Sequence, residues 1–501
     1  MEIKKMSELY TDRLKDESRM TGTCDTFSIS SSVDELQDIA RTMWSQEIPI
    51  TVQGAMTGIC GCAVPAGGHV ISTEKLNRII GYRKDGSKCF VTLEPGVRLA
   101  DLRAFCRQNA YELSGYTFLP NPSETLATLG GMFACNAKGL NSRLHGGTVD
   151  AVNMLKLTIS SGVELEIRRG DCVFDENGCD ITGLGRLEIE NLSKNNSTGK
   201  GLAFAHFGSD LIDVIGGSEG MLAIVTELEL ELKKPASERW GVMFFFDEKL
   251  TALDFSERAI SRFESDKTDY VSLGAAEYLD AASMMLVNNY KQQVTLLKSL
   301  PDFPAHAKGA IYLELEGDFA KETESVLEEL LDLFACVGGK EEDTWAADGE
   351  EEIEKFRRLR HAVPEAVNFE IDKIRQRDTR IIKLCTDLEI PDMRIGKAES
   401  LYSSLLLKSG LNGVVFGHAY SKRLHFNIIS RNYEEYVLGR SLIAELINKL
   451  AVTYGCITWE NGIGKTKKEL FNRLTDQHRH TAEAIKKFFD EKGLLNPGNM
   501  L

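Results

Sequence analysis

The stretch VQGAMTGICGCAVP, residues 52–65, decides the fold more than any other part of the chain. Gly54, Gly58 and Gly61 recur every three or four residues, directly after the apolar segment at 48–52. This pattern predicts a strand that runs into a glycine-rich loop. Without Cβ atoms such a loop can curl until its backbone N–H groups point inward, and the resulting concave nest binds phosphate. The sequence therefore favours an anionic ligand here over a plain tight turn.

Composition indicates a large protein with an acidic balance. A chain of 501 residues is too long for a single core, so we expect two or three domains. The 59 basic and 75 acidic residues give a net charge of −16, which argues against nucleic acid or an anionic membrane surface as a partner. No apolar stretch approaches the roughly 20 residues that span a bilayer, and the N-terminus lacks an apolar signal region. We expect a cytoplasmic protein with no transmembrane segment.

The 11 cysteines are scattered along the chain. The one close pair, Cys60 and Cys62, lies inside the glycine-rich loop. No iron–sulfur or zinc spacing is present, so we interpret the thiols as reduced and structural.

Three further loops rich in Gly, Pro and Asn follow, at 93–102, 119–139 and 216–230, and the chain ends in LLNPGNML. In this order the blocks resemble the FAD-binding domain of the vanillyl-alcohol oxidase superfamily. The resemblance runs from about residue 30 to the end and is strongest to the branch with D-lactate dehydrogenases, D-2-hydroxyglutarate dehydrogenases and the FAD subunit of glycolate oxidase. It implies an α+β fold, with a two-subdomain PCMH-type FAD-binding domain and an α+β cap (substrate) domain.

The hydrophobic patterns fit this organisation. Helical spacing is found at 32–46 and 98–110, strand alternation at 154–167 and 223–232, and no sustained period at 170–210. Composition shifts after 233–240, where long charged helices alternate with strands. We expect an N-terminal extension at 1–30, an FAD-binding domain at 31–235, a cap at 236–445 and a C-terminal segment at 446–501 that returns to the FAD domain.

The resemblance assigns the cofactor residues position by position. The first loop would hold the pyrophosphate, the second block the ribityl chain and the flavin ring, and the third block and the C-terminal Asn-Pro-Gly would complete the shell. The residues so assigned are Gly54, Ala55, Met56, Thr57, Gly58, Ile59, Gly61, Pro120, Pro122, Ser123, Thr128, Gly130, Gly131, Asn136, Gly139, Glu219, Gly220, Ile224 and Asn496.

The first loop departs from the family pattern at three positions. Gln53 stands where the family has arginine, which removes a positive charge near the pyrophosphate, and Met56 and Cys62 stand where it has glycine. Met56 requires either a negative φ or strain that the fold absorbs. No histidine stands at the position that bonds flavin covalently in some relatives, so we expect noncovalent, dissociable FAD.

A second constellation lies at 414–428 and 455–464. His418 and His425 are seven residues apart, a spacing that fits two strands around a tight turn and equally fits ordinary core histidines. The resemblance implies that His418, His425 and Glu460 bind a divalent metal. Two imidazoles and a carboxylate suit Zn²⁺ or Mn²⁺ with open positions for a hydroxy-carboxylate.

Here too the sequence departs from the family. The glycine turn between the histidines is replaced by residues 420–423, and Asn461 replaces the histidine expected to be the general base. An amide does not titrate near neutrality, so Asn461 can orient a substrate but cannot take its proton. A metal-bound alkoxide, Tyr420 or Lys422 are the alternatives, and the sequence does not choose among them.

Three further residues are candidates for the substrate site. Arg360 matches the cap arginine of the family, whose planar guanidinium suits a carboxylate, although a solvated helix arginine is an equal alternative. Asn427 matches the asparagine near the substrate. The family lysine falls on Cys385, and Lys383 lies two residues earlier on the same strand face, which makes it a weak candidate.

The resemblance implies an FAD-dependent dehydrogenase of a small 2-hydroxy acid such as D-lactate, glycolate or 2-hydroxyglutarate, with hydride transfer to flavin N5. An electron-transfer flavoprotein, an iron–sulfur subunit or a quinone would take the electrons, and a homo-oligomer is possible. The alternative is a flavin-carrying subunit of a multi-component oxidoreductase whose hydroxy-acid chemistry is altered or lost, as Asn461 suggests. An oxidase that passes electrons to O₂ differs only in its reoxidation.

Overall fold

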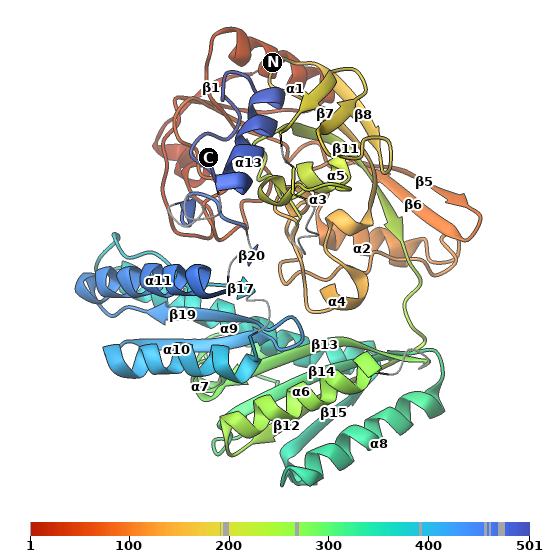
Figure 1. The fold of residues 1–501 in the computed structure, drawn as a ribbon, viewed down its shortest axis with the longest axis vertical. Helices are drawn as coiled ribbons and strands as arrows, with labels where there is room; N and C mark the ends of the chain where they lie inside the picture. The colour runs from red at the N-terminus through yellow and green to blue at the C-terminus, as the bar shows by residue number, and fades with distance from the viewer. Residues whose placement is uncertain are drawn as a thin grey trace. The chain divides into compact units, whose positions relative to one another are not determined.

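The computed structural model describes residues 2–190, 192–193, 200–265, 270–389, 393–454, 458–459, 462–468 and 476–501. The chain forms two compact units (Figure 1). Unit 1 contains residues 1–139, 145–235 and 460–501, and unit 2 contains residues 140–144 and 236–459. The predicted change of domain at residue 446 falls inside α11 (Tyr433–Tyr454), which lies wholly in unit 2. The roles of the four predicted segments stay predictions.

Unit 1 begins with a four-stranded sheet in the order β1-β2-β4-β3. Helix α1 (Val33–Ser45) starts at Ser32, whose side chain accepts a hydrogen bond from the Glu35 N–H. Its apolar face packs with the strands in one core that includes Ile50 and Ile71. The N-terminal extension contains a 3₁₀ helix, η1 (Glu8–Leu14). The strands are β1 (Lys4–Lys5), β2 (Thr26–Ile29), β3 (Ile50–Gln53) and β4 (His69–Ser72).

A five-stranded antiparallel sheet, in the order β5-β6-β11-β7-β8, forms the rest of unit 1. A hairpin of β9 and β10 lies within 170–210, where the sequence shows no period, because its four-residue strands are too short to show one. The remaining elements of unit 1 are β5 (Ile79–Asp85), β6 (Lys88–Leu93), α2 (Leu99–Gln108), α3 (Leu129–Ala134), η2 (Val149–Ala151), β7 (Val152–Thr158), β8 (Glu164–Arg168), β9 (Gly178–Ile181), β10 (Gly185–Glu188), η3 (Leu202–Phe204), α5 (Leu211–Ile215), β11 (Ile224–Leu232) and α13 (Asp476–Phe489).

The C-terminal segment is hydrogen-bonded to the start of β3. The Ile50 N–H donates to the Leu494 carbonyl at 2.7 Å, and the Asn496 N–H donates to the Ile50 carbonyl at 2.7 Å. The Asn496 side chain accepts from the Val52 N–H at 3.3 Å and donates to the Glu219 carbonyl at 2.6 Å. Asn496 therefore holds the last residues against the strand that leads into the first loop.

Unit 2 is built on a nine-stranded sheet in the order β15-β12-β14-β13-β18-β19-β17-β20, with β16 also paired to β19. Helices α6, α8 and α10 contact one another or the same strands, and α7 and α9 form a second pair against the sheet (Figure 1). The elements are α4 (Ser142–His145), β12 (Glu238–Phe246), α6 (Lys249–Ser265), β13 (Val271–Asp280), α7 (Ala281–Lys291), η4 (Thr295–Leu297), β14 (Gly309–Gly317), α8 (Ala320–Cys336), η5 (Glu341–Asp343), β15 (Thr344–Asp348), α9 (Glu350–Arg375), β16 (Leu384–Thr386), β17 (Leu388–Glu389), α10 (Ile395–Ser409), β18 (Asn412–His418), β19 (Arg423–Ile429) and β20 (Thr458–Trp459).

The apolar run at 241–246 shows why helices cover both faces of this sheet. Successive side chains of a strand point to opposite faces. Phe244 packs against Phe255 of α6 and Phe334 of α8, whereas Phe245 packs against Phe303 and Trp345. Both faces are therefore buried, and the strand is continuously apolar instead of alternating. No described helix is both long enough and apolar enough to cross a membrane.

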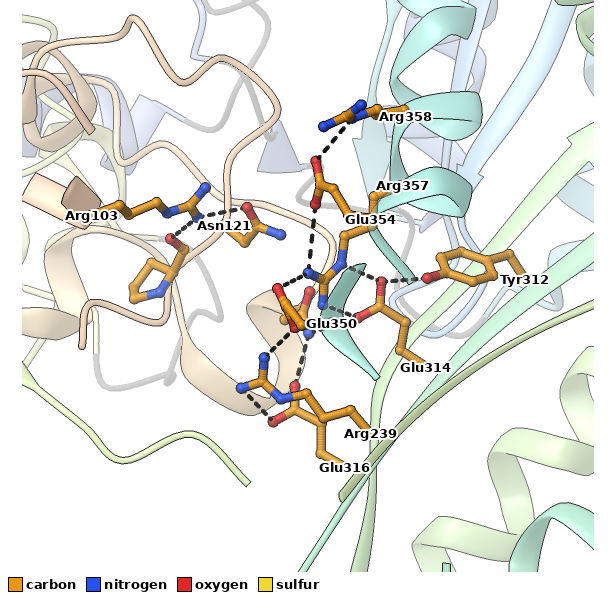
Figure 2. Close-up of polar contacts among 12 residues, drawn as sticks. Arg103, Asn121, Arg239, Tyr312, Glu314, Glu316, Glu350, Glu354, Arg357 and Arg358 are labelled. Atoms are coloured by element: carbon orange, nitrogen blue, oxygen red, sulfur yellow. Dashed lines mark hydrogen bonds and ion pairs between the residues drawn. The ribbon is translucent and has the colours of Figure 1, made fainter. Parts of the chain in front are cut away.

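A polar network around Arg357 and Glu314 in unit 2 (Figure 2) also holds the segment 140–144. The buried Asn141 Nδ2 donates to Glu314 at 3.1 Å and to Glu316 at 2.9 Å. Arg357 donates to both oxygens of Glu314 and to Glu350 at 2.7 to 2.8 Å. The carboxylates neutralise the charge of Arg357, and through Asn141 they attach the segment 140–144 to unit 2.

Gly96→Ala should destabilise unit 1 by about 1–3 kcal/mol, because the new Cβ has no space. An ideal Cβ on Gly96 would lie 2.2 Å from the Thr73 carbonyl oxygen and 2.6 Å from that of Leu76, and both are backbone atoms. Urea unfolding measures the loss. Gly81→Ala is the control, since nothing lies within 4 Å of its Cβ; equal stabilities of the two variants would contradict the packing described.

Candidate functional site

The first loop presents a row of free backbone donors. The N–H groups of residues 54–59 donate no hydrogen bond to any residue in the described part of the chain, and these residues are partly exposed. An ideal Cβ on Gly54 would lie 2.2 Å from the Thr128 hydroxyl oxygen, so the first and second loops approach closely there. Successive free amides in a tight loop form an anion-binding nest.

The departures of this loop have structural explanations. Gln53 is fully buried, and its Nε2 donates to the Arg13 and Ala63 carbonyls at 2.8 Å each, so its side chain braces the loop from within. Met56 has φ of +57°, in the left-handed region that disfavours residues with a Cβ. The fold therefore absorbs the strain at Met56, at an order of 1–3 kcal/mol.

Cys62 is accommodated in a buried position between the loops. Contact with Cys135, burial and the neighbouring Glu219 all raise the pKa of the Cys62 thiol well above its usual range. A buried thiol with a raised pKa is a poor nucleophile. Cys62 therefore fills space that a glycine would leave and stays protonated.

The second block, at 119–139, packs so closely against neighbouring atoms that some of its positions have room only for glycine. An ideal Cβ on Gly139 would lie 1.7 Å from the Asn121 carbonyl oxygen, and one on Gly130 would lie 2.5 Å from Pro95 Cβ. Asn136 is buried with φ of +47°, and its Oδ1 accepts from the Val149 N–H. Arg103, which the sequence did not single out, donates to Asn121 Oδ1 at 2.7 Å and to the Pro120 carbonyl at 3.4 Å (Figure 2).

Glu219 in the third block connects the C-terminal segment to the loops. Its carboxylate accepts from the backbone N–H groups of Ile463 and Gly464 at 2.6 to 3.0 Å, and its carbonyl accepts from Asn496. Burial raises the pKa of Glu219 although these hydrogen bonds oppose the shift. The neighbouring Gly220 has φ of +71°, and Ile224 is a core residue of β11. Glu219 thus binds the C-terminal segment to the third block through hydrogen bonds with Ile463, Gly464 and Asn496.

His418 and His425 lie on the two strands of one hairpin, β18 and β19. In the register of the sheet, Glu277 of β13 lies opposite His418, and Phe416 lies opposite His425. The two imidazole centroids are 5.8 Å apart. The hairpin therefore brings together two of the three predicted metal ligands.

Glu277, which the sequence analysis missed, is the centre of this site. Its side chain is fully buried and bonds His418 Nδ1 through one oxygen and Arg360 Nε, at 2.7 Å, through the other. Burial alone would raise the pKa of Glu277, but the charges and hydrogen bonds of His418 and Arg360 outweigh it and lower the pKa to about 2. One carboxylate thus fixes the orientation of both groups.

The other candidates are distributed around the hairpin. Lys383 Nζ donates to Asn368 of α9 at 3.0 Å, and Asn427 is buried on β19 opposite Val414 and Cys385. The Tyr420 ring is covered by the guanidinium of Arg143 at 3.6 Å. Lys422 has φ of +54° in the turn. Arg143 is a second guanidinium at this hairpin that the sequence did not indicate.

Only two of the three predicted metal ligands, His418 and His425, lie in the described residues. Glu460 and Asn461 lie outside the described residues, and among the residues that are described no group of three His, Cys, Asp or Glu gathers for a metal. A carboxylate on the remote nitrogen of a histidine, as Glu277 provides for His418, is common behind metal ligands. Zinc or manganese binding stays a prediction.

Glu277→Gln should lower the free energy of unfolding by about 3–5 kcal/mol at neutral pH, because it leaves the buried Arg360 without its carboxylate. Since the folded-state pKa of Glu277 is about 2, below the ordinary 4.5, its stabilisation is present above pH 4.5 and is lost as the pH falls toward 2. Urea unfolding at several pH values should show the gap between wild type and variant closing over this range. Glu354→Gln, an exposed carboxylate near Arg358, is the control; a gap independent of pH would contradict the assignment.

Protein purified without chelator or affinity tag should contain a stoichiometric divalent metal, measured by plasma mass spectrometry, if His418, His425 and Glu460 bind one. His425→Ala should lose most of it, whereas His306→Ala, an exposed histidine beside Asp343, should not. Absence of zinc and manganese from the wild type would show that this prediction is wrong.

Comparison with known proteins agrees with both parts of the chain. Residues 27–168 match the FAD binding domain family, and residues 256–500 match the family of FAD linked oxidases, C-terminal domain. The chain is 26% identical to D-lactate dehydrogenase of Anaerostipes hadrus, over 94% of this chain and 88% of that protein. It is 25% identical to the glycolate oxidase subunit GlcD of Bacillus subtilis, over 94% and 87%.

The solved structure of p-cresol methylhydroxylase with bound substrate has the same fold, with a TM-score of 0.69, 14% identity and coverage of 99% of this chain and 93% of that one. These matches confirm the expected PCMH-type FAD-binding domain followed by a second α+β domain, and they support hydroxy-acid oxidation at the level of the family. The chain therefore belongs to the FAD-linked oxidases, with dehydrogenases of hydroxy acids among its relatives.

Proposed function

We propose that this chain oxidises a small 2-hydroxy acid with noncovalent FAD and passes the electrons to an external acceptor. The observation that carries the proposal is the Glu277 carboxylate of β13, which bonds both Arg360 of α9 and His418 of β18. A guanidinium and an imidazole fixed side by side match the two polar groups of a 2-hydroxy acid, its carboxylate and its hydroxyl.

The residues present fit FAD. The free amides of residues 54–59 suit the pyrophosphate, and Gly54, Gly130 and Gly139 lie where a Cβ would collide with the neighbouring loop. The residues listed for the three loops in the sequence analysis would hold the cofactor. Bound FAD supplies a two-electron acceptor for the hydride of the substrate C–H bond.

Arg360 is the proposed partner of the substrate carboxylate. Its Nε is bound to Glu277, and its Nη atoms make no hydrogen bond to the described residues, so the outer edge of the guanidinium can bind a carboxylate. Arg143 is the competing candidate, because it covers Tyr420 and has no carboxylate partner in the described part of the chain. Lys383, directly before β16, and Asn427 of β19 are proposed to support the site.

The substrate hydroxyl is proposed to lie by His418 and His425. His418 Nδ1 is bonded to Glu277, which fixes the orientation of the imidazole ring. The role of Asn461 as an orienting amide without base function stays a proposal, since it lies outside the described residues. The alternative function, a flavin subunit with altered chemistry, is favoured by this same position.

Anaerobic addition of D- and L-2-hydroxy acids to the purified yellow protein should bleach the flavin spectrum with at least one of them. Arg360→Lys keeps a charge beside Glu277 but loses the planar guanidinium, so KM for that acid should rise about 10- to 100-fold with a smaller change in kcat.

Arg358→Lys, on the same helix and near Glu354, is the matched control and should behave as wild type. A KM effect in Arg143→Lys instead of Arg360→Lys would move the carboxylate site to Arg143. A flavin that no hydroxy acid reduces would contradict the proposal and support the altered-subunit alternative.

A further inference from the structure

The charge of the first loop is unusual for a site that binds an anion. Gln53 stands at the arginine position of the family pattern and is buried, with its amide bound to the backbone. The nearest N-terminal arginine, Arg13, is bound to Ser72 at 3.2 Å and to Glu74 at 2.7 Å. Neither side chain is therefore available to neutralise an anion bound by the amides of the first loop.

Two carboxylates lie against the loop. Asp16 is 6% exposed; its Oδ1 accepts from the Ser18 N–H at 3.0 Å, and its buried Oδ2 has no partner in the described structure. An ideal Cβ on Gly58 would be 3.9 Å from this Oδ2. Glu219 is buried beside Cys62. Burial raises the pKa of both carboxyl groups, and the charge of Lys465 opposes this shift in each. A diphosphate bound to the loop amides would add further negative charge, which a cation would compensate.

Lys465, from the C-terminal segment, is placed to compensate negative charge at the first loop. Its backbone N–H donates to the Cys60 carbonyl at 2.9 Å, and an ideal Cβ on Gly61 would lie 3.4 Å from Lys465 Cβ. Its Nζ binds the Gly61 carbonyl at 3.5 Å and Asn499 Oδ1. An ammonium group has three N–H donors, so one remains for a ligand oxygen.

We propose that Lys465 supplies the positive charge that holds the FAD diphosphate, in place of the arginine that the first loop lacks. The inference rests on FAD as the cofactor and does not depend on the substrate. Burial lowers the pKa of Lys465, while Cys62, Glu219 and Asp16 oppose that shift. A bound diphosphate would add a further negative partner and strengthen the charged form of this lysine.

The test compares cofactors with and without phosphate. Full-length protein freed of flavin is titrated with FAD and with riboflavin, and binding is followed by quenching of flavin fluorescence. Lys465→Met should raise the Kd for FAD about 10- to 100-fold and leave the Kd for riboflavin nearly unchanged, because charge-assisted hydrogen bonds to phosphate are lost. Lys465→Arg should keep most of the FAD affinity.

The matched control is Lys487→Met, which removes the same charge from an exposed position on α13. The FAD affinity of wild type should also fall with added salt more steeply than that of Lys465→Met. An equal loss of FAD and riboflavin affinity in Lys465→Met would show that the lysine only braces the loop, which overturns the proposal. Unchanged FAD affinity in Lys465→Met overturns it too, whereas a wild type that binds neither flavin contradicts the cofactor itself.

Discussion

The ionised Glu277 is the interaction on which the substrate side of the molecule depends. A carboxylate without exposure to water is costly, and only two positively charged or polar partners in direct contact make it tolerable. Those partners come from α9 and β18, so the charge ties a helix to two strands of the sheet. The groups proposed to bind the substrate are therefore in place before any substrate arrives, which reduces the entropy that binding must overcome.

The cofactor side follows a different principle. Its groups are mostly backbone amides and small residues, and its precision comes from close approaches such as Gly54 to Thr128. Because backbone amides are proposed to bind the cofactor, side chains in the loop can change: Gln53 turns inward and Met56 accepts a left-handed conformation. Such side-chain changes do not preserve the positive charge of the loop. The proposed source of that charge is Lys465, which contacts the loop from more than 400 residues away in the sequence.

Much of this organisation could be predicted from the sequence. Helices with a clear period, such as α1 and α9, and the apolar strand at 241–246 follow from local patterns. The spacing of His418 and His425 fitted the hairpin that the structure has, but it fitted ordinary core histidines as well. Glu277 could not be found in this way, because its partners are 83 and 141 residues distant. One available signal was a glutamate within the apolar run 273–279 of β13, since acidic residues are almost never buried without a partner.

The path of the chain has a consequence for how this protein is made. Unit 1 is assembled from three separate stretches, and Ile50 in its first sheet is hydrogen-bonded to Leu494 and Asn496, which are synthesised long after it. The first sheet therefore gains its final neighbour only after the residues between β3 and Leu494 have been synthesised. Until then the first loop and its edge strand lack their C-terminal cover, so nascent chains expose an unpaired strand edge of the kind that chaperones and aggregation both recognise.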